Sequence, residues 1–380
     1  MGAQIAVSPG SPKESDAPAG MRVIDIDAQD PRWDAFVNNH PAALIYHHPA
    51  WLHVLEREYG QDSICLACED AAGAIHGILP LAWTKGLPLG PTVRTGRRLS
   101  SLPRTPVAGP LSTDEHATTA LVGAAIDLVR DRPGTRLEMK PSATFSMDSA
   151  RGLTCMPWRT AYVLTLPGPS GELRFGNSRN RARLKWAVRK AIRLGVAVRL
   201  AETREDLRSW YELYLETMRT HMTPPRPFRL FDAMWEVLRP RGLMRLLIAE
   251  RERRLIAGSL YLTFGSTVFY AFNGCRRSEL RLRPNDFIQW HAIETFRRAG
   301  FREYDLGEVS SGNGGLAEFK AKWGADERQL YRFYFPQPRV ERLEDPSTDS
   351  LGPQKILEAG WRCVPLGVTA AVGDAVYRFL

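Results

Sequence analysis

The order of strand and helix patterns along residues 196–335 is the strongest constraint on the fold of this chain. Alternating apolar residues predict strands, apolar residues three and four apart predict helices, and glycine or proline separates them. The order is β-α-α-β-β-β-α-β-α-β, with strands at 196–201, 244–250, 255–264, 267–273, 303–307 and 329–335. This half is therefore predicted to be α+β, with a mixed, mostly antiparallel sheet flanked by helices.

The first half of the chain repeats this order more loosely. A length of 380 residues also suits two cores better than one. We therefore predict two tandem α+β units, residues 21–167 and residues 170–337, joined at Pro167, Gly168 and Pro169. Residues 1–20 are predicted to be a disordered tail, and residues 338–380 a C-terminal tail.

The sequence predicts a cytoplasmic protein. No stretch approaches the roughly 18 consecutive apolar residues of a membrane-spanning helix. The first twenty residues contain no apolar run of signal-peptide length. The amphipathic end of the tail, residues 356–380, leaves two placements open, on the inner membrane surface or packed against the second unit. Cys65 and Cys68 lie three apart on a predicted strand and face opposite ways, so they cannot hold a metal ion together. Because free cysteines are commonly buried, both are predicted to be core thiols.

One segment carries the excess positive charge. The net charge is +9, and nine basic residues and no acidic ones lie between Arg174 and Arg199. Most fall opposite the apolar stripe of a predicted helix, 178–195. Such a face is either solvated or binds an anion, and a diphosphate-linked sugar precursor, an anionic membrane surface and a tRNA backbone all fit. No DNA is expected as a partner. The candidate binding residues of this helix are Arg183, Lys185 and Arg189.

A strand, a glycine-rich turn and a short helix follow one another in residues 301–324. The strand pattern covers 303–307, and the turn contains Gly312, Gly314 and Gly315. Lys320 lies beside the apolar stripe of the helix, toward its edge. Such a unit can position a charged side chain over a cleft. The apolar positions of the helix are Leu316, Phe319 and Trp323.

Several motifs resemble those of a known family. The stretch GLAEFKAKWGAD (315–326), preceded by YDLGE, resembles the signature of Fem-type (FemAB-like) acyltransferases of the GNAT superfamily. The resemblance extends over roughly residues 21–335 and implies two tandem GNAT-like domains. The other motifs are YHHPAWLHVLEREYG, GILPLAW, RARLKWAVRKAIRLGV, ETMRTH and LRPNDFIQWHAIE.

The resemblance implies an N-acyltransferase that forms an amide on an amine of a cell-envelope precursor, related to peptidoglycan or exopolysaccharide. The best-known members take an amino acid from aminoacyl-tRNA. No tightly bound cofactor and no metal are expected, and the co-substrate is acyl-CoA or aminoacyl-tRNA. The glycine-containing loop that holds the pyrophosphate of coenzyme A in GNAT enzymes is replaced here by SELRLRPND (278–286). The insertion that some Fem proteins carry for tRNA is absent as well.

Amide formation needs a deprotonated amine, a stabilised oxyanion and a fixed donor. The resemblance aligns Phe319 and Lys320 with the family's Phe-Lys pair, so Lys320 would hold the oxyanion or a donor phosphate. The competing interpretation is a solvated helix lysine. Asp305 is a candidate general base and Glu308 a weaker one, unless they are structural carboxylates.

Four further polar residues are candidates. His221 could relay a proton or be structural. Tyr270 and Asn273 could hydrogen-bond the acyl donor, although core packing also explains Tyr270. Asn285 could help an anion bind at the start of the helix at Pro284, or simply cap that helix. The alternative function is a non-catalytic binding module for an anionic glycan or nucleotide-sugar ligand.

Overall fold

The computed structural model describes most of the chain outside the two predicted tails. The described residues are 20–60, 63–86, 97–142, 145–146, 148–150, 152–168, 171–173, 175, 177–338 and 360–379. The predicted disorder of residues 1–19, the C-terminal segment 339–359 and part of the predicted connection at Pro169 lie outside them.

The first half of the chain contains both helices and strands. They are β1 (Arg22–Asp25), α1 (Pro31–Asn39), α2 (Pro49–Tyr59), β2 (Ser63–Glu69), β3 (Ile75–Thr84), β4 (Arg98–Ser100), β5 (Leu111–Ser112), α3 (Glu115–Arg130), β6 (Arg136–Met139) and β7 (Thr154–Thr165).

The second half follows the predicted order of elements. It contains α4 (Ser178–Arg193), β8 (Ala197–Leu200), α5 (Arg204–Thr220), α6 (Phe228–Val237), β9 (Met244–Arg251), β10 (Arg254–Phe264), β11 (Thr267–Cys275), the 3₁₀ helix η4 (Arg277–Leu282), α7 (Pro284–Arg298), β12 (Glu303–Val309), α8 (Gly314–Ala321) and β13 (Asp326–Phe335). A final helix, α10 (Leu366–Tyr377), packs on α5.

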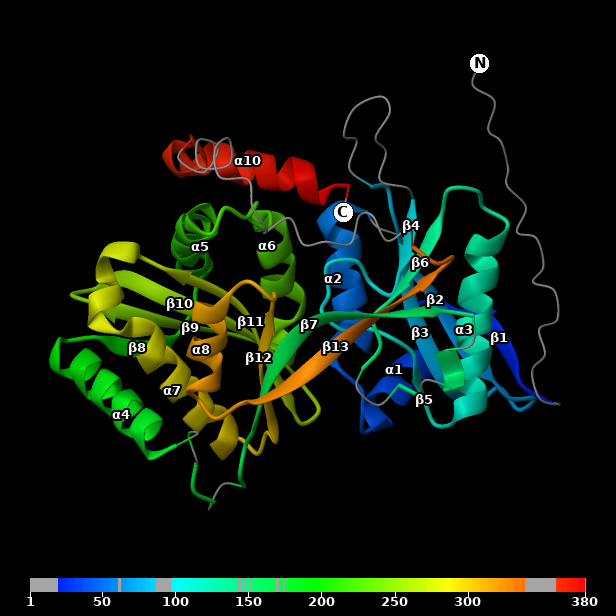
Figure 1. Cartoon of the computed structure of the whole chain (residues 1–380), viewed down its shortest axis with the longest axis horizontal. Helices are drawn as coiled ribbons and strands as arrows, with labels where there is room; N and C mark the ends of the chain where they lie inside the picture. Colours follow the sequence, from blue (N-terminus) through cyan, green and yellow to red (C-terminus); the bar gives the residue numbers. More distant parts are fainter. Residues whose placement is uncertain are drawn as a thin grey trace.

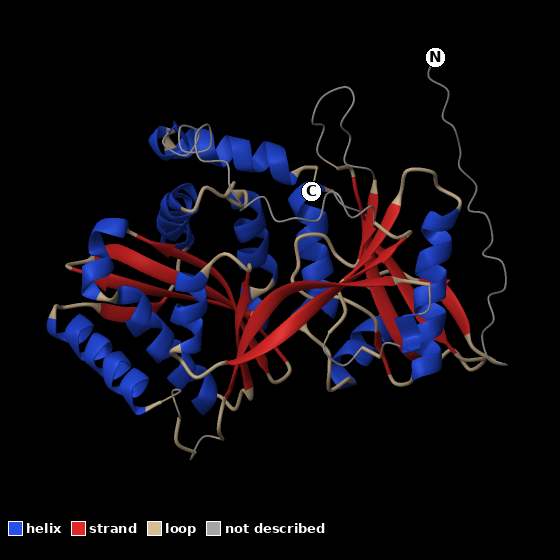
Figure 2. Ribbon diagram, viewed as in Figure 1, coloured by secondary structure: helices blue, strands red, loops and turns tan. Residues whose placement is uncertain are grey.

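The strands of the described residues form one continuous sheet. Its order is β1-β2-β3-β4-β6-β13-β7-β12-β11-β10-β9-β8, with β5 beside β3. Neighbours are antiparallel except the pairs β4–β6 and β11–β12. The long strands β7 and β13 run side by side from one half to the other (Figures 1 and 2). The α+β prediction is confirmed, and the two predicted sheets are joined because β13 inserts between β6 and β7.

The two halves also share a hydrophobic core. Tyr46 of the first half lies with its ring 5.1 Å from that of Phe269 of β11. Helix α2 packs against α6 across the same junction. The indole of Trp210 on α5 donates a hydrogen bond to the backbone carbonyl of Gly258 on β10. Side chains near this junction are therefore held by both halves of the chain.

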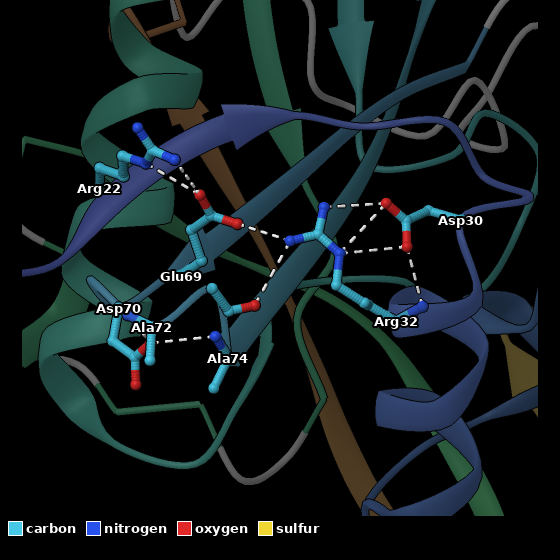
Figure 3. A network of polar contacts seen from close by, with 8 residues as sticks. Arg22, Asp30, Arg32, Glu69, Asp70, Ala72 and Ala74 are labelled. Carbon is cyan, nitrogen blue, oxygen red and sulfur yellow. Dashed lines mark hydrogen bonds and ion pairs between the residues drawn. The ribbon is translucent and has the colours of Figure 1, made fainter.

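A network of charged side chains anchors the outer edge of the first half (Figure 3). Asp30 caps the start of α1, accepting a hydrogen bond from the backbone amide of Arg32. The guanidinium of Arg32 pairs with Asp30 and with Glu69 of β2, and Glu69 also pairs with Arg22 of β1. An open groove of about 640 Å³ adjoins Arg32. Since the guanidinium of Arg32 is engaged by Asp30 and Glu69, the network serves to fix α1 to the sheet.

The structure corrects one sequence prediction near Lys320. Leu316 was expected on the buried stripe of α8 with Lys320 toward its edge. Leu316 is instead 37% exposed and Lys320 only 4% exposed. The helix ends at Ala321, so Trp323 is buried beyond its end rather than within it. The reason is that α8 is turned to bring Lys320 against the backbone of β12.

Candidate active site

The candidate active site begins where strands β11 and β12 stop pairing. Their parallel pairing covers only residues 267–269 of β11 and 303–305 of β12, although both strands continue. A register shift between Asp305 and Glu308 interrupts the pairing of β12 with β7 at the same level. Gly307 lies in this irregular stretch with φ of 83°, a conformation that glycine adopts without strain. Backbone groups of β12 are therefore available to other partners here.

The side chain of Lys320 reaches this point from α8. Its amine donates a hydrogen bond of 3.1 Å to the backbone carbonyl of Glu308. A Cβ atom on Gly307 would lie 3.4 Å from the same amine, an ordinary contact distance, so the amine lies directly beside this glycine. Burial lowers the pKa of Lys320 to about 8, while the charges of Asp305 and Glu308 oppose that shift. The amine is thus mostly protonated at neutral pH and easily perturbed.

Asp305 supplies a carboxylate beside this amine. Burial raises the pKa of Asp305 to about 6, and a hydrogen bond from the backbone amide of Gly307, 2.6 Å long, acts in the opposite direction. Lys320 also favours the charged form of Asp305. An acid with a pKa near 6 beside an amine with a pKa near 8 is the pattern expected of a proton-transfer pair.

Glu308 connects the site to the first half of the chain. Its carboxylate pairs at 2.9 Å with Arg159 of β7 and lies 3.8 Å from Arg332 of β13. Arg332 is buried and lies 3.9 Å from Glu138 of β6. Buried Lys140, whose pKa burial lowers to about 7, feels the charges of both glutamates. A line of alternating charges therefore runs from the candidate site across the junction of the halves.

Tyr46 is a component that the sequence analysis did not single out. It is buried, and burial raises the pKa of its hydroxyl, an effect that the charges of Asp305 and Glu308 reinforce. It comes from the first half, in a short 3₁₀ helix before α2. The signal was present, because Tyr46 begins the stretch YHHPAW that resembles the Fem-type proteins.

The other candidate residues lie in different surroundings. The hydroxyl of Tyr270 is directed to Gln289 and Ser259, and burial raises its pKa. Asn273 accepts a hydrogen bond from Ser259. His221 is exposed at the end of α5, and no contact among the described residues joins it to Lys320. His221 therefore lies apart from Lys320, whereas the backbone of Tyr270 lies at the site, since its carbonyl oxygen would be 3.8 Å from a Cβ atom on Gly307.

Asn285 and Phe319 lie near the ends of α7 and α8. The side chain of Asn285 hydrogen-bonds the thiol of Cys275, while its own oxygen has no partner among the described residues. The ring of Phe319 lies 4.2 Å from the amine of Lys322. Neither side chain contacts Lys320 through a hydrogen bond in the described structure.

The basic helix α4 forms a second, separate feature. Asn177 caps the helix, and Arg183, Lys185 and Arg189 are exposed as predicted for a solvated or anion-binding face. Trp186 is 51% exposed, with Lys190 and Arg283 at 5.1 and 5.6 Å from its rings. A small cavity of about 100 Å³ lies here, lined in part by Arg183, Arg283 and Lys322. This surface offers cations and one aromatic side chain to an anion.

The start of α7 is occupied by a carboxylate. Asp286 in its first turn is buried and pairs with Lys322. Pro284 begins the helix and has no N–H to donate. The preceding residues form η4 rather than a glycine loop. A pyrophosphate at this position would meet the charge of Asp286, so the residues present do not fit the usual coenzyme A cradle.

No group of His, Cys, Asp and Glu side chains in the described part of the chain could hold a metal ion. Among the described helices, none is long and apolar enough to cross a membrane.

Part of the chain is similar in sequence to known proteins. Residues 178–321 match the family model described as an acetyltransferase (GNAT) domain. The UDP-N-acetylmuramoylpentapeptide-lysine N(6)-alanyltransferase of Weissella viridescens is 25% identical over 134 residues, which are 34% of this chain and 38% of that protein. Residues 178–321 are thus similar to a GNAT domain, and the chain is similar to a Fem-type protein in sequence over a third of its length and in fold over most of it. The predicted resemblance and the predicted enzyme class, an acyltransferase, are thereby confirmed.

Solved structures support the fold of most of the chain. The crystal structure of FemX has a TM-score of 0.65 at 16% identity, and the match covers 83% of this chain and 97% of that one. The C-terminal domain of a putative lysylphosphatidylglycerol synthetase from Agrobacterium fabrum has a TM-score of 0.55 at 14% identity, with 80% and 90% covered. At these identities the structures show a common fold. The curated alanyltransferase is matched over less than half of its length, so its activity is not carried over by the match alone.

Proposed function

We propose that this protein is an N-acyltransferase that forms an amide on an amine of a cell-envelope precursor. The observation that carries the proposal is the buried amine of Lys320, held against β12 beside Asp305 where β11 and β12 part. A fixed positive charge at this point would stabilise the oxyanion of a tetrahedral intermediate. The name of the Weissella relative supports a precursor of the peptidoglycan type as acceptor.

In the proposed reaction, Asp305 takes the proton from the attacking ammonium or amine of the acceptor. The amine nitrogen then forms a bond to the acyl carbon, and Lys320 stabilises the negative charge on the acyl oxygen. Collapse of the intermediate breaks the bond to the donor's leaving oxygen or sulfur, which receives the proton that Asp305 took up; an acceptor that starts as an ammonium releases one further proton to solvent. The hydroxyl of Tyr46, which feels the charges of the same two carboxylates, would orient the acceptor.

We favour aminoacyl-tRNA over acyl-CoA as the donor. Asp286 and Pro284 make the start of α7 a poor pyrophosphate site. The exposed cations of α4, beside the cavity lined by Arg183, Arg283 and Lys322, suit a sugar-phosphate backbone instead. Arg183, Lys185 and Arg189 would then bind donor phosphates, outside the transfer centre.

The test is direct reconstitution. Purified protein is incubated with alanyl-tRNA or acetyl-CoA as donor and a UDP-linked muropeptide with a free lysine amine as acceptor. Mass spectrometry then follows the acceptor. A mass gain of one alanyl residue from alanyl-tRNA is expected. A gain of one acetyl group from acetyl-CoA alone would replace the proposed donor. No gain with any donor, on this acceptor or on amino-sugar polymers, would contradict an acyltransferase and favour a glycan-binding module.

A further inference from the structure

One tryptophan of the basic helix α4 is not used by the core. The helix packs against α7 through buried residues that include Leu184 and Ala191 (Figure 1). Trp186 lies off this buried stripe, and 51% of the residue is exposed. The indole therefore offers a flat aromatic surface to a ligand on the same helix that carries the excess positive charge.

The cavity of about 100 Å³ beside Trp186 lies between α4 and the start of α7. Arg183, Arg283, Asp286 and Lys322 contribute to its lining. Lys322 pairs with Asp286, so these two side chains together add little net charge. In the part of the chain that the structure describes, Arg183 and Arg283 are exposed and have no acidic partner. The cavity thus combines an aromatic wall, a carboxylate and two cations that no acid neutralises.

The carboxylate of Asp286 determines which part of a nucleotide fits inside the cavity. Asp286 is buried, and an ionised carboxylate only accepts hydrogen bonds. A phosphate placed inside would lie against this negative charge, whereas a nucleobase is uncharged and can present an amino group. The phosphates of the same nucleotide are then left to the exposed guanidinium groups of Arg183 and Arg283.

Two cations lie over the indole in the absence of a ligand. The Nζ of Lys190 is 5.1 Å and the guanidinium carbon of Arg283 is 5.6 Å from the centre of the Trp186 ring. At an exposed site such a contact is weaker than the stacking of a nucleobase on an aromatic side chain. Both cations are carried on long side chains, so they can leave the ring and bind the phosphates of the incoming nucleotide. The exchange replaces a weak contact by stacking and by charge-assisted hydrogen bonds.

The cavity is close in the chain to the proposed transfer centre. Lys322 is the residue that follows α8, two positions after Lys320. The acyl group of an aminoacyl-tRNA is esterified to the last nucleotide of an unpaired 3′ end. A base held beside Lys322 therefore belongs to the nucleotides nearest the acyl group, which are single-stranded and free to stack on a protein side chain.

We propose that Trp186 stacks on an unpaired nucleobase at the 3′ end of the donor RNA, while Arg183 and Arg283 bind the adjoining phosphates. This inference rests on the proposed function, because it requires an RNA-linked donor, and it assigns the single-stranded end of that RNA to this cavity. Trp186 binds the donor and takes no part in the chemistry. Its loss should therefore raise the KM for the donor and leave the rate at saturating donor unchanged.

The test uses the full chain and two short labelled RNAs with the same phosphates. One RNA ends in CCA, and the other lacks the bases of that end on an intact sugar-phosphate backbone. Trp186→Ala removes the proposed stacking surface, and Trp186→Phe keeps a smaller one. Tyr331→Ala is the matched control, because it removes another exposed aromatic residue, 46% exposed on β13. Fluorescence anisotropy measures the affinity of each protein for each RNA at several salt concentrations.

Trp186→Ala should bind the intact RNA about 5- to 100-fold more weakly than wild type or Tyr331→Ala, because a stacked base is lost. Trp186→Phe should recover most of this loss, and all four proteins should bind the abasic RNA equally. Stacking releases no counterions, so the slope of log K against log salt should be unchanged in Trp186→Ala. The slope should become shallower in Arg183→Gln, which removes a phosphate contact.

An equal loss of affinity for the intact and the abasic RNA would assign the effect of Trp186→Ala to a disturbed helix and overturn the inference. Unchanged binding in that variant, or a wild-type protein that does not bind the intact RNA, would overturn it as well. Transfer from alanyl-tRNA to the precursor amine is measured separately. Normal transfer without base-dependent binding at Trp186 would reject this inference and leave the proposed function in place. Base-dependent binding without transfer would reject the proposed function and keep the RNA site.

Discussion

The amine of Lys320 and the backbone carbonyl of Glu308 are joined by a hydrogen bond of 3.1 Å. This contact fixes a buried cation beside a strand whose pairing has just stopped. Gly307 beside this contact has a φ of 83°, a backbone conformation that strains any residue with a side chain. The fold therefore fixes the position of the positive charge on Lys320.

Gly307→Ala should therefore damage both stability and transfer. The φ of 83° at this position costs a non-glycine residue about 1–2 kcal/mol, measured as a lower free energy of unfolding. Relief of that strain should shift the β12 backbone against which the Lys320 amine is held, which should lower kcat by about 10- to 100-fold. Gly315→Ala is the matched control, since nothing lies within 4 Å of its Cβ and its φ is not positive. Equal activity of the two variants would contradict the role of Gly307.

The rate of transfer should depend on pH as a bell-shaped curve. Asp305 acts as a base only when charged, so activity is lost as pH falls below about 6, to which burial raises its pKa. Lys320 acts as a cation, so activity is lost as pH rises above about 8, to which burial lowers its pKa. Steady-state rates from pH 5 to 10 measure both limbs. Asp305→Asn should lower the rate by about 10²- to 10⁴-fold and remove the acidic limb. An unchanged acidic limb in that variant would exclude Asp305 as the base.

Charge reversal on α4 should weaken the binding of tRNA in a salt-dependent way. Replacing Arg183, Lys185 and Arg189 by Glu removes up to three phosphate contacts, which lowers the slope of log K against log salt by about 2–3. Fluorescence anisotropy with labelled tRNA measures affinity between 50 and 200 mM salt, a range over which such contacts are strongly screened. Arg208→Glu reverses an exposed charge on α5 and serves as control. An unaltered slope in the triple variant would place the donor elsewhere.

The elements of the second half could be predicted closely because their periodicity is local. Helix α5 spans Arg204–Thr220, between the first two predicted strands of this half, and the capping box of Thr203 and Asp206 explains where it starts. What joins the halves is not local. No pattern in residues 326–335 shows that β13 inserts between β6 and β7, since that pairing is chosen by residues far apart in the chain.

The candidate site was predictable only in part, for a related reason. Lys320 and Asp305 share a short stretch whose motif marks them. Tyr46 and Arg332 join them through tertiary packing, which leaves no local spacing to recognise. A hydrophobicity pattern also could not predict that Lys320 is buried in place of Leu316. Lysine is ordinarily a surface residue, and the sequence does not show that this amine is paired inside the protein.

His47 should make the stability of the protein fall in mild acid. Its imidazole is buried, and the ring contacts the amide of Leu44 and the carbonyl of Gly109. Burial lowers its pKa to about 4, below the ordinary value of about 6.5. The unfolded chain therefore binds more protons between pH 4 and 6.5, and stability decreases as pH falls through that window, by up to about 3 kcal/mol. Urea unfolding at several pH values measures this. His47→Gln should be less stable at pH 7 but flatter across the window, and an equally steep dependence would assign the effect to other groups.

The central claim is that the buried cation of Lys320 performs the transfer. Lys320→Met keeps the length of the side chain and removes its charge, whereas Lys85→Met makes the same change at an exposed lysine. The decisive measurement is the single-turnover rate of acyl transfer to the precursor amine, with circular dichroism as a check on folding. The account predicts a loss of about 10²- to 10³-fold for Lys320→Met, with Lys85→Met unchanged. A folded Lys320→Met protein that transfers at the wild-type rate would contradict it.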